Sequence, residues 1–199
     1  MATKSRKLTE REWIRFDQKR SLMIKEIKAN PEKINKNTFW MLTMMSPPPR
    51  GSLMEKRHIK KHPKLLTKIG TDVQRGDFVT KSGSYYEYKF SLVNEKRNCC
   101  FLQIRLFQDC DYILEVYDSI EKEFYIFLVP HEEMKQLIKE HGRITHGTEK
   151  DNDDKNKMYS LRPKLKSTAK EYAIWKILCA NFSITESQLK KKYTQKQSK

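Results

Sequence analysis

Residues 75–91 read RGDFVTKSGSYYEYKFS, and this stretch decides the fold of the middle of the chain. Apolar and polar side chains alternate on both sides of a Gly-centred turn at 82–84, which is typical of a β-hairpin. Glu87 and Lys89 are two residues apart and therefore project from one face of the second strand. The opposite face carries three aromatic side chains and needs burial, so the charged face is either wet or lines a cleft.

Asp77 lies on the first strand of this hairpin. If the turn is centred near Ser82, antiparallel pairing places Asp77 level with Glu87. Two carboxylates beside the Lys89 ammonium suit a hard divalent cation and an activated water. The same charges also form a favourable exposed pair on an ordinary hairpin, so both interpretations stay open on this stretch alone.

Two neighbouring segments offer further polar groups to the same place. Glu55 lies in a helix expected over residues 52–62, directly before the hairpin. Gln103 lies in FLQIRLFQ, where a third strand is expected over residues 99–107. We expect Glu55 to supply a third carboxylate and the Gln103 amide to face the same cleft.

The remaining pattern predicts an α/β fold of mixed α+β type, with a roughly five-stranded mixed sheet flanked by helices. Two mostly buried strands are expected at 111–118 and 123–130. Helices are expected at 131–142 and 167–182, followed by a basic, frayed tail. The polar segment at 145–160 is expected to be a long loop.

The N-terminal part is expected to be helical. Thr9 and Glu12 form a capping box ahead of an amphipathic run that should end before Pro31. A second helix is expected from Pro31 through the Met-rich run, and SPPPRG at 46–51 is expected to be an extended connector. We divide the chain into an N-terminal helical segment, 1–47, for clamping or dimerisation, and a main domain, 48–199.

Composition narrows the function class. Lys and Arg number 41 against 25 Asp and Glu, which gives a formal net charge of +16. Such a charge favours a nucleic-acid partner, although a basic protein without that role remains the alternative. The four cysteines show no C-x-x-C pair or zinc spacing, and no signal peptide or membrane span is visible. The sequence predicts a soluble intracellular protein that uses no organic cofactor.

The hairpin and its surroundings resemble the PD-(D/E)xK nuclease superfamily, which includes the type II restriction endonucleases. The resemblance covers about residues 48–140: RGSLMEKRHIKK as the first core helix, then the Asp77 strand, the Glu87-x-Lys89 strand and CCFLQIRLFQDCDYILEVYD. One position departs from the pattern, because Gly76 precedes Asp77 where the family often has proline.

The resemblance implies a restriction-endonuclease-like core and Mg²⁺-dependent cleavage of double-stranded DNA at specific sites, leaving 5′-phosphate ends. Asp77 and Glu87 would hold the metal, Lys89 would position the attacking water, and Glu55 would match the helix glutamate of many members. Gln103 would match a polar residue on the following strand. A homodimer would place two sites across the duplex. The implied setting is the cytoplasm of a prokaryote or a virus-infected cell.

Other charged residues remain candidates for DNA contact, namely Arg50, Arg75, His146 and Arg162. Histidines 58, 62, 131 and 141 are expected at the surface. Residues 164–193 fit either a helix-turn-helix, with Lys190–Lys192 on phosphates, or a packing helix followed by a basic tail. Two other functions stay open: a structure-specific repair or recombination nuclease, and a non-catalytic DNA-binding protein.

Overall fold

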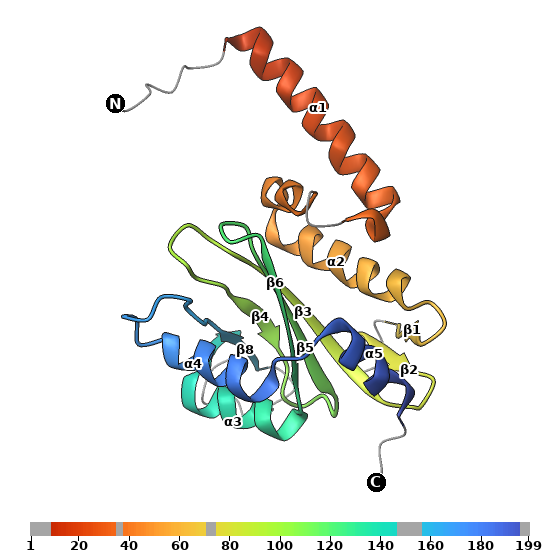
Figure 1. Cartoon of the computed structure of the whole chain (residues 1–199), viewed down its shortest axis with the longest axis vertical. Helices are drawn as coiled ribbons and strands as arrows, with labels where there is room; N and C mark the ends of the chain where they lie inside the picture. The colour runs from red at the N-terminus through yellow and green to blue at the C-terminus, as the bar shows by residue number, and fades with distance from the viewer. Residues whose placement is uncertain (1–8, 35–37, 71–74, 147–156, 196–199) are drawn as a thin grey trace.

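A computed structural model of the chain describes residues 9–34, 38–70, 75–146 and 157–195. A five-stranded mixed sheet forms its centre, with helices on both faces and a second, three-stranded sheet (Figure 1). The predicted mixed α/β class with a five-stranded sheet is therefore confirmed.

The large sheet has the strand order β1-β2-β3-β5-β6. Its strands are β1 (Leu66–Lys68), β2 (Phe78–Thr80), β3 (Tyr85–Val93), β5 (Asp111–Asp118) and β6 (Glu123–Val129). The predicted hairpin is β2 and β3, and β5 pairs with β6 as expected. The β3–β5 pair is parallel, so the chain between these strands must return across the sheet.

The third expected strand does not belong to the large sheet, as predicted, but to the three-stranded sheet. Residues 99–107 contain β4 (Phe101–Ile104), which pairs with β8 (Met158–Leu161), and β8 pairs with β7 (Arg143–His146). The register of β4 shifts between Phe101 and Ile104, and Gln103 between them has a positive φ of 56°. The fifth strand of the large sheet is β1, which follows the helix expected at residues 52–62 and was not predicted.

Each face of the large sheet has its own apolar core. On one face, Tyr86, Tyr88 and Ile113 pack beneath α2 (Pro47–Lys61) and α5 (Glu186–Thr194). On the other face, Tyr112, Leu114 and Val116 pack against α3 (His131–His141), α4 (Tyr172–Ile177) and β8. Alternation along β5 thus sends side chains into both cores, as expected for a strand between two covered faces.

The N-terminal region differs from the prediction after its first helix. The Thr9–Glu12 capping box starts α1 (Glu10–Ala29), which projects from the body (Figure 1). Two short 3₁₀ helices, η1 (Pro31–Lys33) and η2 (Phe39–Met44), replace the expected second α-helix. The expected extended connector is wrong, because Pro47–Pro49 open α2, where proline at the first turn costs no hydrogen bond. No helix in the described ranges combines the length and apolarity needed to cross a membrane.

The C-terminal region contains a helix, α5, where a frayed tail was expected. After α4, a π-helical segment η4 (Leu178–Phe182) leads to α5. Thr185 and Gln188 form a capping box at the start of α5, and Leu189 and Tyr193 are fully buried. The two apolar anchors explain why this basic stretch is ordered on the sheet.

Candidate active site

Asp77 is held against the strand that carries Glu87 and Lys89. The register pairs Phe78 with Tyr86, so its continuation sets Asp77 opposite Glu87, as predicted. The Asp77 backbone N–H donates to the Tyr86 carbonyl at 2.8 Å, and Asp77 Oδ2 accepts from the Tyr88 backbone N–H at 2.8 Å. Asp77 is therefore bonded to β3 at the residues immediately before and after Glu87.

Gly76 explains how the chain reaches this position. Its φ is +95°, a conformation that favours glycine. A Cβ atom at this residue would lie 2.6 Å from the Tyr86 carbonyl oxygen. The departure from the proline of the resembled pattern thus has a local cause, since only glycine fits against β3 here.

Glu87 is buried, so the face of β3 that carries Glu87 and Lys89 is not an open, hydrated surface. Its exposed fraction is 2%, and Lys89 Nζ lies 2.5 Å from Glu87 Oε1. Burial raises the pKa of Glu87; the negative charge of Asp77 adds to this rise, while Lys89 and Arg105 oppose it. The alternative of an ordinary wet hairpin face is wrong, because the Glu87 carboxylate is buried and not hydrated at the surface.

Glu55 of α2 lies near enough to Asp77 and Lys89 for their charges to act on it. Burial raises the pKa of Glu55, and the charge of Asp77 contributes to the rise, while Lys68 and Lys89 oppose it. Lys68 Nζ lies 2.9 Å from Glu55 Oε1, so the Glu55 carboxylate forms an ion pair with β1.

The cluster brings together four predicted residues, Glu55, Asp77, Glu87 and Lys89. It also contains two cations that sequence reasoning missed: Lys68 on β1 and Arg105 after β4. Within the described ranges, no three His, Cys, Asp or Glu side chains are close enough to hold a metal ion as they stand. The arrangement nevertheless concentrates carboxylates in a desolvated place, which is where general acid–base or metal-assisted chemistry is found.

Gln103 lies apart from this cluster in the contacts that the structure gives. It belongs to β4 in the three-stranded sheet and is exposed. With Leu102, Thr145 and Met158 it lines a separate hollow. Its expected strand in the large sheet is wrong, because β4 pairs with β8 in the three-stranded sheet.

The four residues expected to contact DNA differ in how far their side chains are exposed to solvent. Arg50 is partly buried and its Nη1 donates to the Leu42 carbonyl at 3.3 Å, so it joins α2 to η2. The Arg75 guanidinium lies 5.3 Å from the centre of the Tyr85 ring, and its residue is exposed, as is Arg162. His146 ends β7, and its side chain lies outside the described part; so do residues 147–156 of the expected loop.

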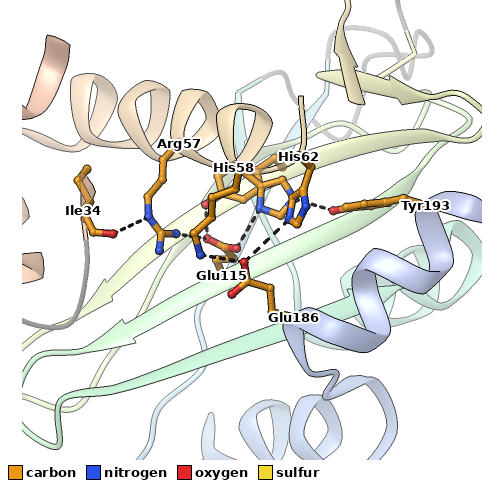
Figure 2. Close-up of polar contacts among 9 residues, drawn as sticks. Ile34, Arg57, His58, His62, Glu115, Glu186 and Tyr193 are labelled. Atoms are coloured by element: carbon orange, nitrogen blue, oxygen red, sulfur yellow. Dashed lines mark hydrogen bonds and ion pairs between the residues drawn. The ribbon is translucent and has the colours of Figure 1, made fainter. Parts of the chain in front are cut away.

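A second polar cluster was not predicted from the sequence; it lies among α2, β5 and α5 (Figure 2). His58 and His62, expected at the surface, are only 2% and 7% exposed. His58 Nδ1 lies 3.1 Å from Glu115 Oε1, and its Nε2 lies 2.5 Å from the Tyr193 hydroxyl. One signal was available in the sequence: Glu115 is a lone acid inside the apolar run of β5, and a buried charge needs partners.

In comparisons with known proteins, no family model matches the chain and no curated protein has a significantly similar sequence. The function must therefore be argued from the site.

Proposed function

We propose that the chain is a Mg²⁺-dependent, site-specific double-stranded DNA endonuclease of the PD-(D/E)xK type. The observation that carries this proposal is the burial of Glu87 against Lys89, with Asp77 bonded to the β3 backbone on both sides of Glu87. A carboxylate on an ordinary surface hairpin stays hydrated, whereas catalytic sites use burial to shift the pKa of a carboxylate.

The residues fit a hard divalent cation. The pKa values of Glu55 and Glu87 are both raised, by burial first and then by neighbouring negative charge. A bound cation would relieve that repulsion, as Lys68 already does in part at Glu55 Oε1. Mg²⁺ typically takes one or two protein carboxylates and completes its coordination with water and substrate phosphate.

Each residue then has a role that its position supports. Asp77 and Glu87 would hold the ion, and Glu55 would support one of its waters or a second ion. When bound, Mg²⁺ supplies charge stabilisation at the scissile phosphate and lowers the pKa of a bound water. Lys89 keeps two N–H groups beyond its contact with Glu87, and these orient the water that attacks phosphorus. The bond to the 3′-oxygen breaks, which leaves 5′-phosphate and 3′-hydroxyl ends.

The charge of the chain supports a duplex DNA substrate. A net charge of +16 favours a polyanion, and Arg75 and Arg162 are exposed and suited to phosphate. Two strands must be cut, so a homodimer with one site per strand is part of the proposal. We place the enzyme in the cytoplasm, where its DNA substrate would lie. We assign Gln103 no role in the reaction, since it lies in another hollow.

Substitutions in the site test the proposal directly. Glu87→Ala and Lys89→Ala should each lower the rate of plasmid cleavage by at least about 100-fold, since each removes charge that acts on the transition state. Both variants should still bind DNA in a gel-shift assay, because neither residue is needed for the phosphate contacts at the surface.

Lys81→Ala, in the exposed hairpin turn, is the matched control and should cleave normally. If either site variant keeps near-full activity, the assignment of the site is wrong. Cleavage that depends on branches or ends and not on sequence would indicate a structure-specific nuclease. Binding without cleavage by the unmodified chain, in Mg²⁺ or Mn²⁺, would indicate a non-catalytic DNA-binding protein.

A further inference from the structure

A buried polar network joins α2, β3, β5 and α5 (Figure 2). Its centre is Glu115 of β5, which is 2% exposed. His58 of α2 bonds one carboxylate oxygen at 3.1 Å, and the Tyr88 hydroxyl of β3 bonds the other at 2.5 Å. Tyr193 of α5 completes the network through the second ring nitrogen of His58, at 2.5 Å. Residues far apart in sequence are thus fixed to one carboxylate.

Donor and acceptor roles in the network are consistent. Burial alone would raise the pKa of Glu115, but the bond from His58, the bond from Tyr88 and the Arg57 charge lower it below its usual value. An ionised Glu115 only accepts, so His58 Nδ1 and the Tyr88 hydroxyl both donate to it. His58 Nε2 and the Tyr193 hydroxyl satisfy each other, whichever of the two carries the proton. Arg57 Nη1, at 4.0 Å from Glu115, balances its charge.

The network is coupled to the candidate active site through α2. Glu55 and His58 are three residues apart and therefore share one side of the helix. Arg57 Nε also donates to the Ile34 carbonyl at 3.1 Å, which joins α2 to the segment after η1. A small rotation or slide of α2 that breaks the His58–Glu115 bond would therefore also move Glu55 relative to β3.

The network is coupled to the site through β3 as well. Tyr88, which bonds Glu115 through its side chain, lies between Glu87 and Lys89 and donates its backbone N–H to Asp77. Helix α5 contacts both the β2–β3 hairpin and α2. The Ser82 hydroxyl, in the hairpin turn, donates to the Tyr193 carbonyl at 3.4 Å, and Lys61 of α2 pairs with Glu186 of α5 at 2.8 Å.

We infer that Tyr193 and His58 are positioning residues, through which the C-terminal helix α5 holds Glu55 of α2 at a fixed place relative to Asp77 and Glu87. The inference rests on the proposed function, because it assigns Glu55 to the metal site. A buried charged network is not needed for stability alone, since apolar residues of the same volume often serve as well or better. Here the network specifies one alignment of α2, which carries Glu55, with β3, which carries Glu87.

The test measures metal binding by the full-length chain, with Mn²⁺ alone as the probe. Tyr193→Phe removes one hydroxyl and keeps the ring, so the chain should fold, which thermal unfolding checks. Its Mn²⁺ affinity by calorimetry should fall about tenfold, the lower end of the effect of losing an outer-shell partner at a metal site. Tyr117→Phe is the control, since it removes a hydroxyl from the same core without touching Glu115, and its affinity should match the unmodified chain.

A double-substitution cycle separates positioning from general weakening of the fold. If Tyr193 acts through Glu55, then adding Tyr193→Phe to Glu55→Gln should lower Mn²⁺ affinity no further, although it still lowers the melting temperature. An equal tenfold loss in both backgrounds would overturn the inference, as would an unchanged affinity in Tyr193→Phe alone; both leave the proposed nuclease intact. If the unmodified chain binds no divalent ion and cuts no DNA, the proposed function fails and the inference fails with it.

Discussion

At the scale of single residues, the site depends on the positions along β3 at which Asp77 and the covering elements contact the strand. Glu87 and Lys89 share a face because strand side chains alternate, and that much follows from sequence. Their burial does not follow from alternation, because it depends on what covers that face. Asp77 reaches β3 only because Gly76 lets the backbone approach closely, so this glycine is as important to the geometry as the charged residues.

Substitution of Gly76 should therefore damage both stability and the site. In Gly76→Ala, a methyl group would lie 2.6 Å from the Tyr86 carbonyl, at a φ of +95°. We expect a loss of about 1–3 kcal/mol in the free energy of unfolding, measured with urea. Gly51→Ala, in α2 with open space around it, is the control and should raise stability by about 0.5–1 kcal/mol. A neutral Gly76→Ala would contradict the described approach of Asp77 to β3.

At the scale of elements, periodicity predicted β3, β5, β6 and α3 well, because their patterns are local. The start of α2 does not follow from the pattern, because three consecutive prolines indicate an extended connector although the first turn of a helix also accepts them. The sheet of β4 and the network of His58, Glu115 and Tyr193 were missed for another reason. His58 is 57 residues from Glu115 and 135 from Tyr193, and no local pattern encodes such pairings.

The packing of α5 on α2 should make stability depend on pH. Desolvation lowers the pKa of His62 to about 4, helped by nearby positive charge; the groups facing it are His58 and Lys61 of α2, with Glu186 and Lys190 of α5. The unfolded chain, with an ordinary His pKa near 6.5, binds this proton first, so stability is full above pH 6.5 and falls as pH drops toward 4. We expect a loss of about 2–3 kcal/mol from this residue, measured by urea unfolding at pH 7 and pH 4.5.

The matched variant is His62→Gln, which cannot titrate. Its stability should change less between pH 7 and pH 4.5 than that of the unmodified chain, by about the same amount. An identical pH dependence in the two proteins would show that the His62 ring is not kept neutral beneath α5.

At the scale of the whole molecule, α1 is the element least covered by the rest of the chain. Four large apolar side chains on it are 48–68% exposed: Trp13, Ile14, Phe16 and Leu22. Exposed aromatic groups on one projecting helix are typical of protein–protein contact. They fit the proposed homodimer, in which two active sites act on opposite strands.

This expectation has a direct test in light scattering coupled to size exclusion. The unmodified chain should have the mass of a dimer, and Trp13→Glu with Phe16→Glu should shift it to monomer. Ile120→Glu is the control, since Ile120 is 52% exposed in a turn remote in sequence from α1. A monomeric unmodified chain, or a double variant that stays dimeric, would rule out this role for α1.

The most direct test of the central claim is to map the ends that the chain makes on a sequenced plasmid in Mg²⁺. We predict discrete fragments whose ends all fall at one short sequence, each with a 5′-phosphate that ligase joins without kinase treatment. The contradicting result is a plasmid that stays intact with Mg²⁺ and with Mn²⁺ while the same preparation binds it. In that case the buried cluster of Glu55, Asp77, Glu87 and Lys89 does not cleave DNA.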